Sequence, residues 1–181
     1  MKRRLTLVTG GARSGKSRFA LESAMPRARK AFIATATPCD KEMAARIARH
    51  RSERGADFLT IEEPLDLAGA LGALPRDMDV AVVDCLTLWL GNLMHKYGGI
   101  REDDCPEIEA LVEALRSPPC DLLVVTNEVG MGIVPENEAA RTFRDVAGRL
   151  NARVARMADN VVLLVSGIPV TIKGTEKHEA T

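Results

Sequence analysis

Eight consecutive residues have the types and the spacing needed to bind the phosphates of a nucleoside triphosphate. They match G-x-x-x-x-G-K-[ST], the phosphate-binding loop (P-loop), and they follow a short apolar run, Leu5–Val8, and precede apolar residues at helical spacing. Gly10 and Gly15 allow a tight turn, and successive backbone N–H groups at the start of a helix attract an anion. We therefore expect the triphosphate to be bound by Gly10, Gly11, Ala12, Arg13, Ser14, Gly15, Lys16 and Ser17.

The same motif predicts a catalytic lysine and half of a metal site. Lys16 would reach the β- and γ-phosphates, and the hydroxyl group of Ser17 would bind Mg²⁺. Asp84 ends the apolar run Val80–Val83, which is typical of an acid that holds the same metal opposite the serine. Alternatively, Asp84 caps a helix that begins at Leu86. The predicted metal ligands are Ser17 and Asp84.

A histidine among arginines is the second candidate for chemistry. His50 shares a predicted helical face with Met43 and Ile47, and this pattern alone favours a partly buried core histidine. Alternatively, a neutral imidazole beside a triphosphate could act as a nucleophile. In that case the neighbouring arginines would neutralise charge on the phosphates. Otherwise the arginines form a solvated helix face and pair with Glu42 and Glu53. These arginines are Arg46, Arg49, Arg51 and Arg54.

The stretch Asn127–Pro135 is too apolar and too rich in glycine to be a mere linker. Gly130 and Gly132 suggest a flap that moves over a cleft and exposes apolar surface to a substrate. Alternatively, the loop packs into the core or into a subunit interface. Its apolar residues are Val129, Met131, Ile133 and Val134.

Strand-like and helix-like segments that alternate along the chain must position these residues. Strands are predicted at 5–8, 31–35, 58–61, 80–84, 122–126 and 161–165, with an edge strand at 169–173. Helices are predicted directly after the P-loop and at 40–54, 66–74, 87–97 and 107–115. A last and longest helix is predicted to begin at Pro135 and to carry an apolar stripe that ends at Met157. This order predicts the α/β class, with a mostly parallel sheet and helices on both faces.

Ligands of such sheets bind outside the carboxyl ends of the strands. Six stretches should therefore converge on one cleft, namely the P-loop, 35–37, Glu62, Asp84, 126–128 and 166–167. We expect residues 1–174 to form a single P-loop nucleotide-binding domain and residues 175–181 to form a flexible tail.

Composition excludes several classes of function. Lys and Arg together number 25, as do Asp and Glu, and aromatic residues make up only 3% of the 181 residues. These values argue against nucleic acid as a partner. No stretch is long and apolar enough for a membrane span, and four widely spaced cysteines indicate free thiols in a reducing, cytoplasmic environment.

Sequence also argues against a regulatory GTPase. Cys85–Thr87 follows Asp84 where D-x-x-G would be expected, and Thr126–Val129 stands where a base-reading N-K-x-D would follow a later strand. Two other readings stay open. One is a P-loop kinase of small molecules in which His50 is structural, and the other is a RecA-like ATPase or regulatory nucleotide-binding module that acts on DNA or protein.

Several stretches together resemble one family, the bifunctional adenosylcobinamide kinase/adenosylcobinamide-phosphate guanylyltransferases of cobalamin biosynthesis. The resemblance runs from about Leu7 to Lys173, and its most specific part is Thr126–Pro135. The other matching stretches are Gly10–Ser17, Ile33–Ala36, Glu42–Ile47, His50-Arg51 and Val165–Pro169.

This resemblance implies two reactions, a RecA-like sheet and a homotrimer. The enzyme would phosphorylate the aminopropanol hydroxyl of adenosylcobinamide, a corrinoid, with ATP or GTP. It would then transfer GMP from GTP through a guanylylated His50 to give adenosylcobinamide-GDP. The implied nucleotide contacts are Gly10 to Ser17, Thr35, Ala36, Thr37, Arg51, Ser52, Glu53, Arg54, Glu62 and Asp84.

Overall fold

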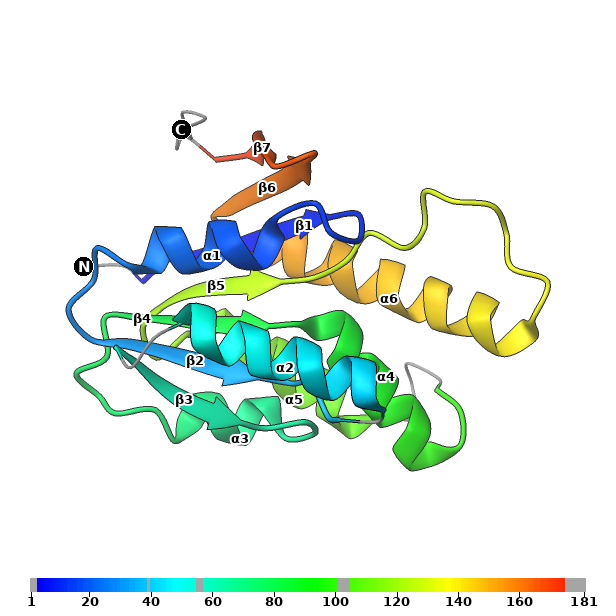
Figure 1. Ribbon diagram of the computed structural model, residues 1–181, viewed down its shortest axis with the longest axis horizontal. Helices are drawn as coiled ribbons and strands as arrows, with labels where there is room; N and C mark the ends of the chain where they lie inside the picture. The colour runs from blue at the N-terminus through cyan, green and yellow to red at the C-terminus, as the bar shows by residue number, and fades with distance from the viewer. Residues whose placement is uncertain (1–2, 39, 55–56, 101–104, 175–181) are drawn as a thin grey trace.

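The computed structural model describes residues 3–38, 40–54, 57–100 and 105–174. The side chains of Glu42, Arg46, His50, Glu53 and Arg54 and the predicted tail at 175–181 lie outside this description. Strands and helices alternate along most of the described chain (Figure 1), except for two consecutive helices before the fifth strand and two consecutive strands at the end. The strands are β1 (Leu5–Gly10), β2 (Lys30–Ala34), β3 (Phe58–Glu62), β4 (Val80–Asp84), β5 (Asp121–Val125), β6 (Asn160–Val165) and β7 (Ile168–Lys173). The helices are α1 (Lys16–Ala24), α2 (Lys41–Arg54), α3 (Leu67–Gly72), α4 (Leu86–Tyr97), α5 (Pro106–Arg116) and α6 (Glu138–Met157).

The described strands form one sheet in the order β3-β2-β4-β5-β1-β6-β7. Every neighbouring pair from β3 to β6 is parallel, and β7 alone pairs antiparallel, at the edge beside β6. Pro169 lies in this edge strand, where a missing backbone donor is tolerated. The mostly parallel sheet and the edge strand are both confirmed.

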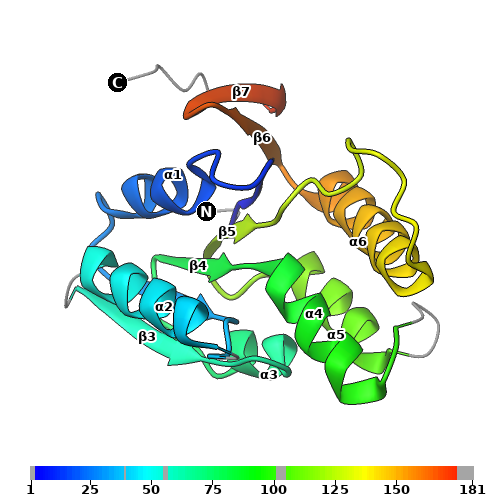
Figure 2. The ribbon, with the colours of Figure 1, turned by 45° about the vertical axis from the view of Figure 1, so that its right-hand side comes forward.

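Helices cover both faces of the sheet, as the alternating pattern predicts. Figure 2 shows α1 and α2 on one side of the sheet and α4, α5 and α6 on the other. The larger core cluster lies on the α4–α6 side and includes Trp89, Ile108 and Leu150. A smaller cluster lies on the α1 side and includes Val8, Phe32 and Val82. The two faces therefore differ in how much apolar surface they bury.

The longest helix, α6, has the predicted apolar stripe but a different beginning. Ala147, Leu150 and Val154 are buried, so the stripe faces the core as expected. The prediction that Pro135 occupies the first turn is wrong, because α6 begins at Glu138. The side chain of Asn137 accepts a hydrogen bond from the backbone of Ala140 at 3.1 Å. An asparagine that caps free N–H groups in this way fixes the helix start.

Within the described ranges, no helix combines the length and the apolar character that a membrane span requires. Three of the four cysteines fall in these ranges, and Cys85, Cys105 and Cys120 are all buried free thiols. The prediction of free thiols is confirmed for these three. Cys39 lies outside the described residues.

Candidate active site

The P-loop joins β1 to α1 at the carboxyl edge of the sheet. Gly10 has φ 146°, and a Cβ atom placed on it would lie 2.5 Å from the carbonyl oxygen of Leu164. Gly15 has φ 95° where it caps α1. Both positions need glycine, the first because β6 approaches closely and both because of the positive φ. The backbone N–H of Gly167 donates to Ser14 at 3.0 Å, so the turn after β6 also holds the loop.

Lys16 lies inside the loop, with only 7% of its surface exposed. Its Nζ donates to the carbonyl oxygen of Gly11 at 2.6 Å and contacts Ser14 Oγ at 3.5 Å. Its ammonium group therefore lies among the backbone groups that the motif assigns to phosphate binding. The catalytic role of Lys16 stays a prediction, with which this position is consistent.

Ser17 and Asp84, the predicted metal ligands, line one cavity of about 100 Å³. A hydroxyl and a carboxylate oxygen are donors that Mg²⁺ prefers, so the residues present fit this metal. The alternative role for Asp84 as a helix cap is not borne out, because α4 is capped at Cys85 and shows no side-chain cap hydrogen bond. Glu62 and Asn127 line the same cavity. The strand ends therefore converge as predicted.

Thr35 fixes the segment that carries the acid. Its backbone N–H donates to the carbonyl of Asp84 at 3.1 Å. Its hydroxyl donates to the carbonyl of Cys85 at 2.9 Å and accepts from the N–H of Cys85 at 2.8 Å, and the Asp84–Cys85 peptide is cis. Thr35 is fully buried, so its side chain acts on Asp84 and Cys85, and it is Ala36 that lines the cavity.

Asn92 of α4 ties together the ends of two strands, and sequence reasoning missed it. Its Nδ2 donates to the carbonyl of Thr35 at 2.7 Å and to that of Pro64 at 3.1 Å. The hydroxyl of Thr37 donates to Asn92 Oδ1 at 3.2 Å. Thr37 itself is exposed. Asn92 therefore orients the predicted nucleotide stretch 35–37, although no local pattern marks a mid-helix asparagine for such a role.

A second network, also missed, holds the start of the loop after β5. The backbone N–H of Asn127 donates to the Thr87 hydroxyl at 2.8 Å, and its carbonyl accepts from Asn151 Nδ2 at 3.1 Å. The Thr126 hydroxyl donates to Asn151 Oδ1 at 2.8 Å. Glu128 N–H donates to the carbonyl of Gly10 at 3.0 Å. The loop therefore begins on a fixed base that joins α4, α6 and the P-loop.

The middle of that loop is exposed. Met131, Ile133 and Val134 are 81%, 97% and 59% exposed, whereas Val129 is half-buried against the larger core. Packing of residues 131–134 into the core of this chain is therefore excluded. A flap over a cleft and a subunit interface both stay consistent with the exposure.

Helix α2 lies beside the cavity that Ser17 and Asp84 line. Met43 and Ile47 line this cavity, so the face on which they lie looks toward it. Position 50 falls on the same helical face by its spacing. The side chain of His50 lies outside the described residues, so neither its core role nor its nucleophilic role is tested.

The remaining predicted contacts lie around this helix and the P-loop. Arg51 forms an ion pair with Glu62, and both side chains are more than half exposed. Ser52, Gly11, Ala12 and Arg13 are exposed. The side chains of Glu53 and Arg54 lie outside the described residues. The structure thus brings Glu62 and Arg51 together at the edge of the cavity.

Cys85 is a cysteine in the cavity wall, but it is not poised to react. Burial, and then the neighbouring Asp84 carboxylate, raise the pKa of its thiol to about 12. Because the thiolate is the nucleophilic form, the Cys85 thiol is inert at neutral pH. Cys85 is therefore not a candidate nucleophile of this cavity.

Comparison with known proteins identifies close relatives. A family model described as cobinamide kinase / cobinamide phosphate guanyltransferase matches residues 6–172. The bifunctional adenosylcobalamin biosynthesis protein CobU of Escherichia coli (strain K12) is 42% identical over 180 residues, which cover 93% of this chain and 99% of that protein. The bifunctional adenosylcobalamin biosynthesis protein CobP of Pseudomonas aeruginosa is 43% identical over 169 residues, which cover 93% of this chain and 96% of that protein.

Solved structures of lower identity share the fold. The RadB recombinase superposes with a TM-score of 0.56 at 16% identity, covering 98% of this chain and 84% of that one. An ATPase from a type III secretion system superposes with a TM-score of 0.52 at 10% identity, covering 90% of this chain and 51% of that one. The predicted RecA-like P-loop NTPase fold is therefore confirmed.

Proposed function

The chain belongs to the cobinamide kinase / cobinamide phosphate guanyltransferase family of bifunctional enzymes, and we propose that both of its reactions use the one triphosphate site around Lys16. The observation that carries this proposal is the cavity that P-loop residue Ser17 and strand-end residue Asp84 share with Met43 and Ile47 of α2. A nucleotide held by the P-loop would lie beside the helix that carries His50.

In the kinase reaction, the hydroxyl oxygen of the aminopropanol arm of adenosylcobinamide attacks the γ-phosphorus of ATP or GTP. The bond from that phosphorus to the β-phosphate oxygen breaks, a nucleoside diphosphate leaves, and the hydroxyl proton is lost. Lys16 and the P-loop N–H groups orient the phosphates and neutralise their charge, which is most of what phosphoryl transfer requires. Ser17 and Asp84 would hold Mg²⁺, which would neutralise further charge on the phosphate oxygens.

In the guanylyltransferase reaction, an unprotonated ring nitrogen of His50 attacks the α-phosphorus of GTP. An N–P bond forms, the bond to the β-phosphate oxygen breaks, and pyrophosphate leaves. A phosphate oxygen of adenosylcobinamide phosphate then attacks the same phosphorus, breaking the N–P bond and freeing the imidazole. Position 50 lies one helical turn beyond Ile47 on the face that borders the cavity, which supports this role.

The test is to incubate the protein with GTP labelled in the α-phosphate and to measure acid-labile, base-stable label on the protein. We expect wild type to take up label, His50→Ala to take up none while it retains kinase activity, and Lys16→Ala to lose both activities. Equal labelling of His50→Ala and wild type would overturn the covalent role of His50. A wild type that phosphorylates cobinamide but takes up no label would be a kinase in which His50 is structural.

We further propose that the enzyme is a cytoplasmic homotrimer, as the family resemblance implies. The β6–β7 hairpin supports association between copies, because it exposes a set of apolar side chains. Val165, Ile168, Val170 and Ile172 are 42–61% exposed. Sedimentation of wild type and Ile168→Glu would test this, since a trimer built on the hairpin should dissociate in the variant. The use of nucleoside triphosphates as substrates supports the proposal that the enzyme is cytoplasmic.

A further inference from the structure

A second and larger cavity lies at the opposite end of α4 from Asp84. Its volume is about 690 Å³, within the range of small-molecule sites. The last turn of α4 and residues 98–100 bound it on one side, and the first turn of α6 bounds it on the other. Figure 2 shows these two helix ends on the same flank of the molecule. Neither of the two proposed reactions assigns a substrate group to this cavity.

The lining of this cavity suits a molecule that has both apolar surface and amide groups. Met94, Tyr97 and Ile100 supply apolar surface, while Asn137 and Thr142 supply polar side chains. Among the described residues that line the cavity, Glu138 has the one charged side chain, and none of them is basic. The phosphates of a nucleoside triphosphate would be repelled by the Glu138 carboxylate. A neutral or cationic occupant fits better.

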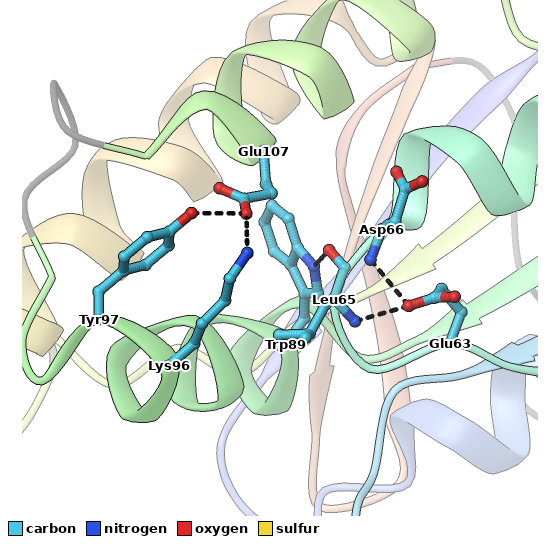
Figure 3. A network of polar contacts seen from close by, with 7 residues as sticks. All are labelled: Glu63, Leu65, Asp66, Trp89, Lys96, Tyr97 and Glu107. Atoms are coloured by element: carbon cyan, nitrogen blue, oxygen red, sulfur yellow. Dashed lines mark hydrogen bonds and ion pairs between the residues drawn. The ribbon is translucent and has the colours of Figure 1, made fainter.

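Tyr97 is held in place at the wall of the cavity. Its hydroxyl donates to Glu107 Oε1 at 2.8 Å, and Lys96 Nζ donates to the same oxygen at 2.7 Å (Figure 3). Although burial works against it, hydrogen bonds from these two residues hold the pKa of Glu107 below its ordinary value. Tyr97 is 45% exposed and lines the cavity, so part of this fixed aromatic residue is accessible to a ligand. Its oxygen, having donated its own proton, can still accept a hydrogen bond from an amide.

One loop connects the two cavities. Asn127 lines the small cavity beside Asp84, and Asn137 lines the large one. The segment between them exposes Met131 and Ile133. Figure 2 shows this segment leaving β5 and running to the start of α6. Along α4, whose 12 residues extend over roughly 18 Å, the distance between the cavities is comparable with the reach of a large ligand with a side arm.

We propose that the large cavity binds the edge of the corrin macrocycle of cobinamide, and that the hydroxyl-bearing arm follows the 127–137 loop to the P-loop. This inference rests on the proposed function, which supplies the corrinoid. A corrin ring has flat apolar faces and amide groups at its rim, which match Tyr97, Asn137 and Thr142. A Co(III) corrin with one carbanionic axial ligand carries a positive charge, which Glu138 complements.

The first test fills the cavity. Ala139 lines it from the first turn of α6 and is exposed, so Ala139→Trp adds bulk there without disturbing the core. Ala152→Trp is the matched control, because Ala152 is an exposed alanine of α6 outside the lining. Equilibrium dialysis, read by the visible absorbance of cobinamide, should show binding at least tenfold weaker in Ala139→Trp and unchanged in Ala152→Trp. Labelling by GTP should be unchanged in both.

The second test removes the charge. Glu138→Gln should weaken binding of cationic adenosylcobinamide about threefold, as expected of a partly exposed charge pair, and leave binding of neutral dicyanocobinamide unchanged. Wild-type affinity for cobinamide in Ala139→Trp, or equal loss for both corrinoids in Glu138→Gln, would overturn the cavity assignment while leaving the proposed function standing. Absence of cobinamide binding by wild type would instead overturn the corrinoid substrate itself.

Discussion

Helices α4 and α2 both border the small cavity, but they are anchored very differently. Four residues of α4 are fully buried, namely Leu86, Trp89, Leu90 and Leu93. Trp89 Nε1 also donates to the carbonyl of Leu65 at 2.7 Å (Figure 3). None of the described side chains of α2 is buried, and only Met43 and Ile47 are half-buried.

This difference suggests how one site can serve two reactions. The anchored wall consists of α4 and of the strand ends that Asn92 and Thr35 bind. It holds Asp84 in one position, whichever phosphate of the nucleotide reacts. The lightly anchored wall, α2, would add the proposed nucleophile at position 50 to this fixed frame. Changes in the first wall should therefore damage the fold and both activities, and changes in the second should damage one activity and little else.

The largest expected effect is on activity. Asp84→Asn should lower both the kinase and the guanylyltransferase rate by roughly 100-fold or more, because the carboxylate proposed to hold Mg²⁺ beside the phosphates loses its charge. His50→Ala should lower only the second rate. Steady-state assays of both reactions on both variants measure this. If the kinase rate falls equally in Asp84→Asn and His50→Ala, the proposal that α2 serves only the second reaction is wrong.

The next effect is on stability. Trp89→Ala should lower the free energy of unfolding by about 3–5 kcal/mol, because a fully buried indole and its hydrogen bond are removed. Trp89 is the sole tryptophan, so urea unfolding should be followed by far-UV circular dichroism instead of fluorescence. Leu93→Ala is a second buried site in α4 and should cost about 2–5 kcal/mol. A loss below about 1 kcal/mol in both variants would contradict the anchoring of α4.

A smaller loss is expected at the amide that joins the strand ends. Asn92→Ala removes the donor to the carbonyls of Thr35 and Pro64 and should cost about 1–3 kcal/mol. It should also lower the rates of both reactions, since Thr35 holds Asp84 and Cys85. Urea unfolding and the paired assays measure the two effects. Full activity with full stability would show that the network positions nothing.

The corresponding change in α2 should cost least. Ile47→Ala removes a half-buried side chain and should lower the free energy of unfolding by only about 1 kcal/mol. The same urea experiment measures it beside Leu93→Ala. A loss as large as that of the buried leucine would mean that α2 is anchored as firmly as α4.

A pH experiment examines the start of α4. Because the pKa of Cys85 is raised to about 12, from 9.0, the folded state favours the protonated thiol. The stability gained from this preference is present below about pH 9 and is lost as the pH rises toward 12. Iodoacetamide at pH 8.5 should leave the peptide that contains Cys85 unmodified until urea is added, as measured by mass spectrometry. Rapid modification in the folded protein would contradict this prediction, because it would show that the Cys85 thiol is accessible to the reagent.

The sequence predicts what depends on local pattern. The P-loop is contiguous, and its glycines are required by backbone geometry that the motif encodes. The runs 80–84 and 122–126 are predicted as strands because both of their faces are buried, which leaves an unbroken apolar sequence. Asp84 could be placed at the cavity because ligands bind at the carboxyl ends of parallel strands. Each of these inferences needs only neighbouring residues and a general rule.

What the sequence could not predict depends on contacts between distant segments. Asn92 and Asn151 act through hydrogen bonds to residues 24–57 positions away, and an asparagine within a helix has no distinctive pattern. At the start of α6, Pro135 and Asn137 are competing signals, and the side-chain cap decides between them only in three dimensions. The large cavity forms between two helix ends that only the fold brings together.

The bond between Gly167 and Ser14 has a consequence for regulation. It joins the turn between β6 and β7 directly to the phosphate-binding loop. A molecule that covers Val165 and Ile168 therefore acts on a turn whose backbone helps to hold the nucleotide site. If such a contact changes the affinity for nucleotide by some factor, bound nucleotide must change the affinity of that contact by the same factor. If the hairpin does mediate self-association, this association would be thermodynamically linked to occupancy of the P-loop.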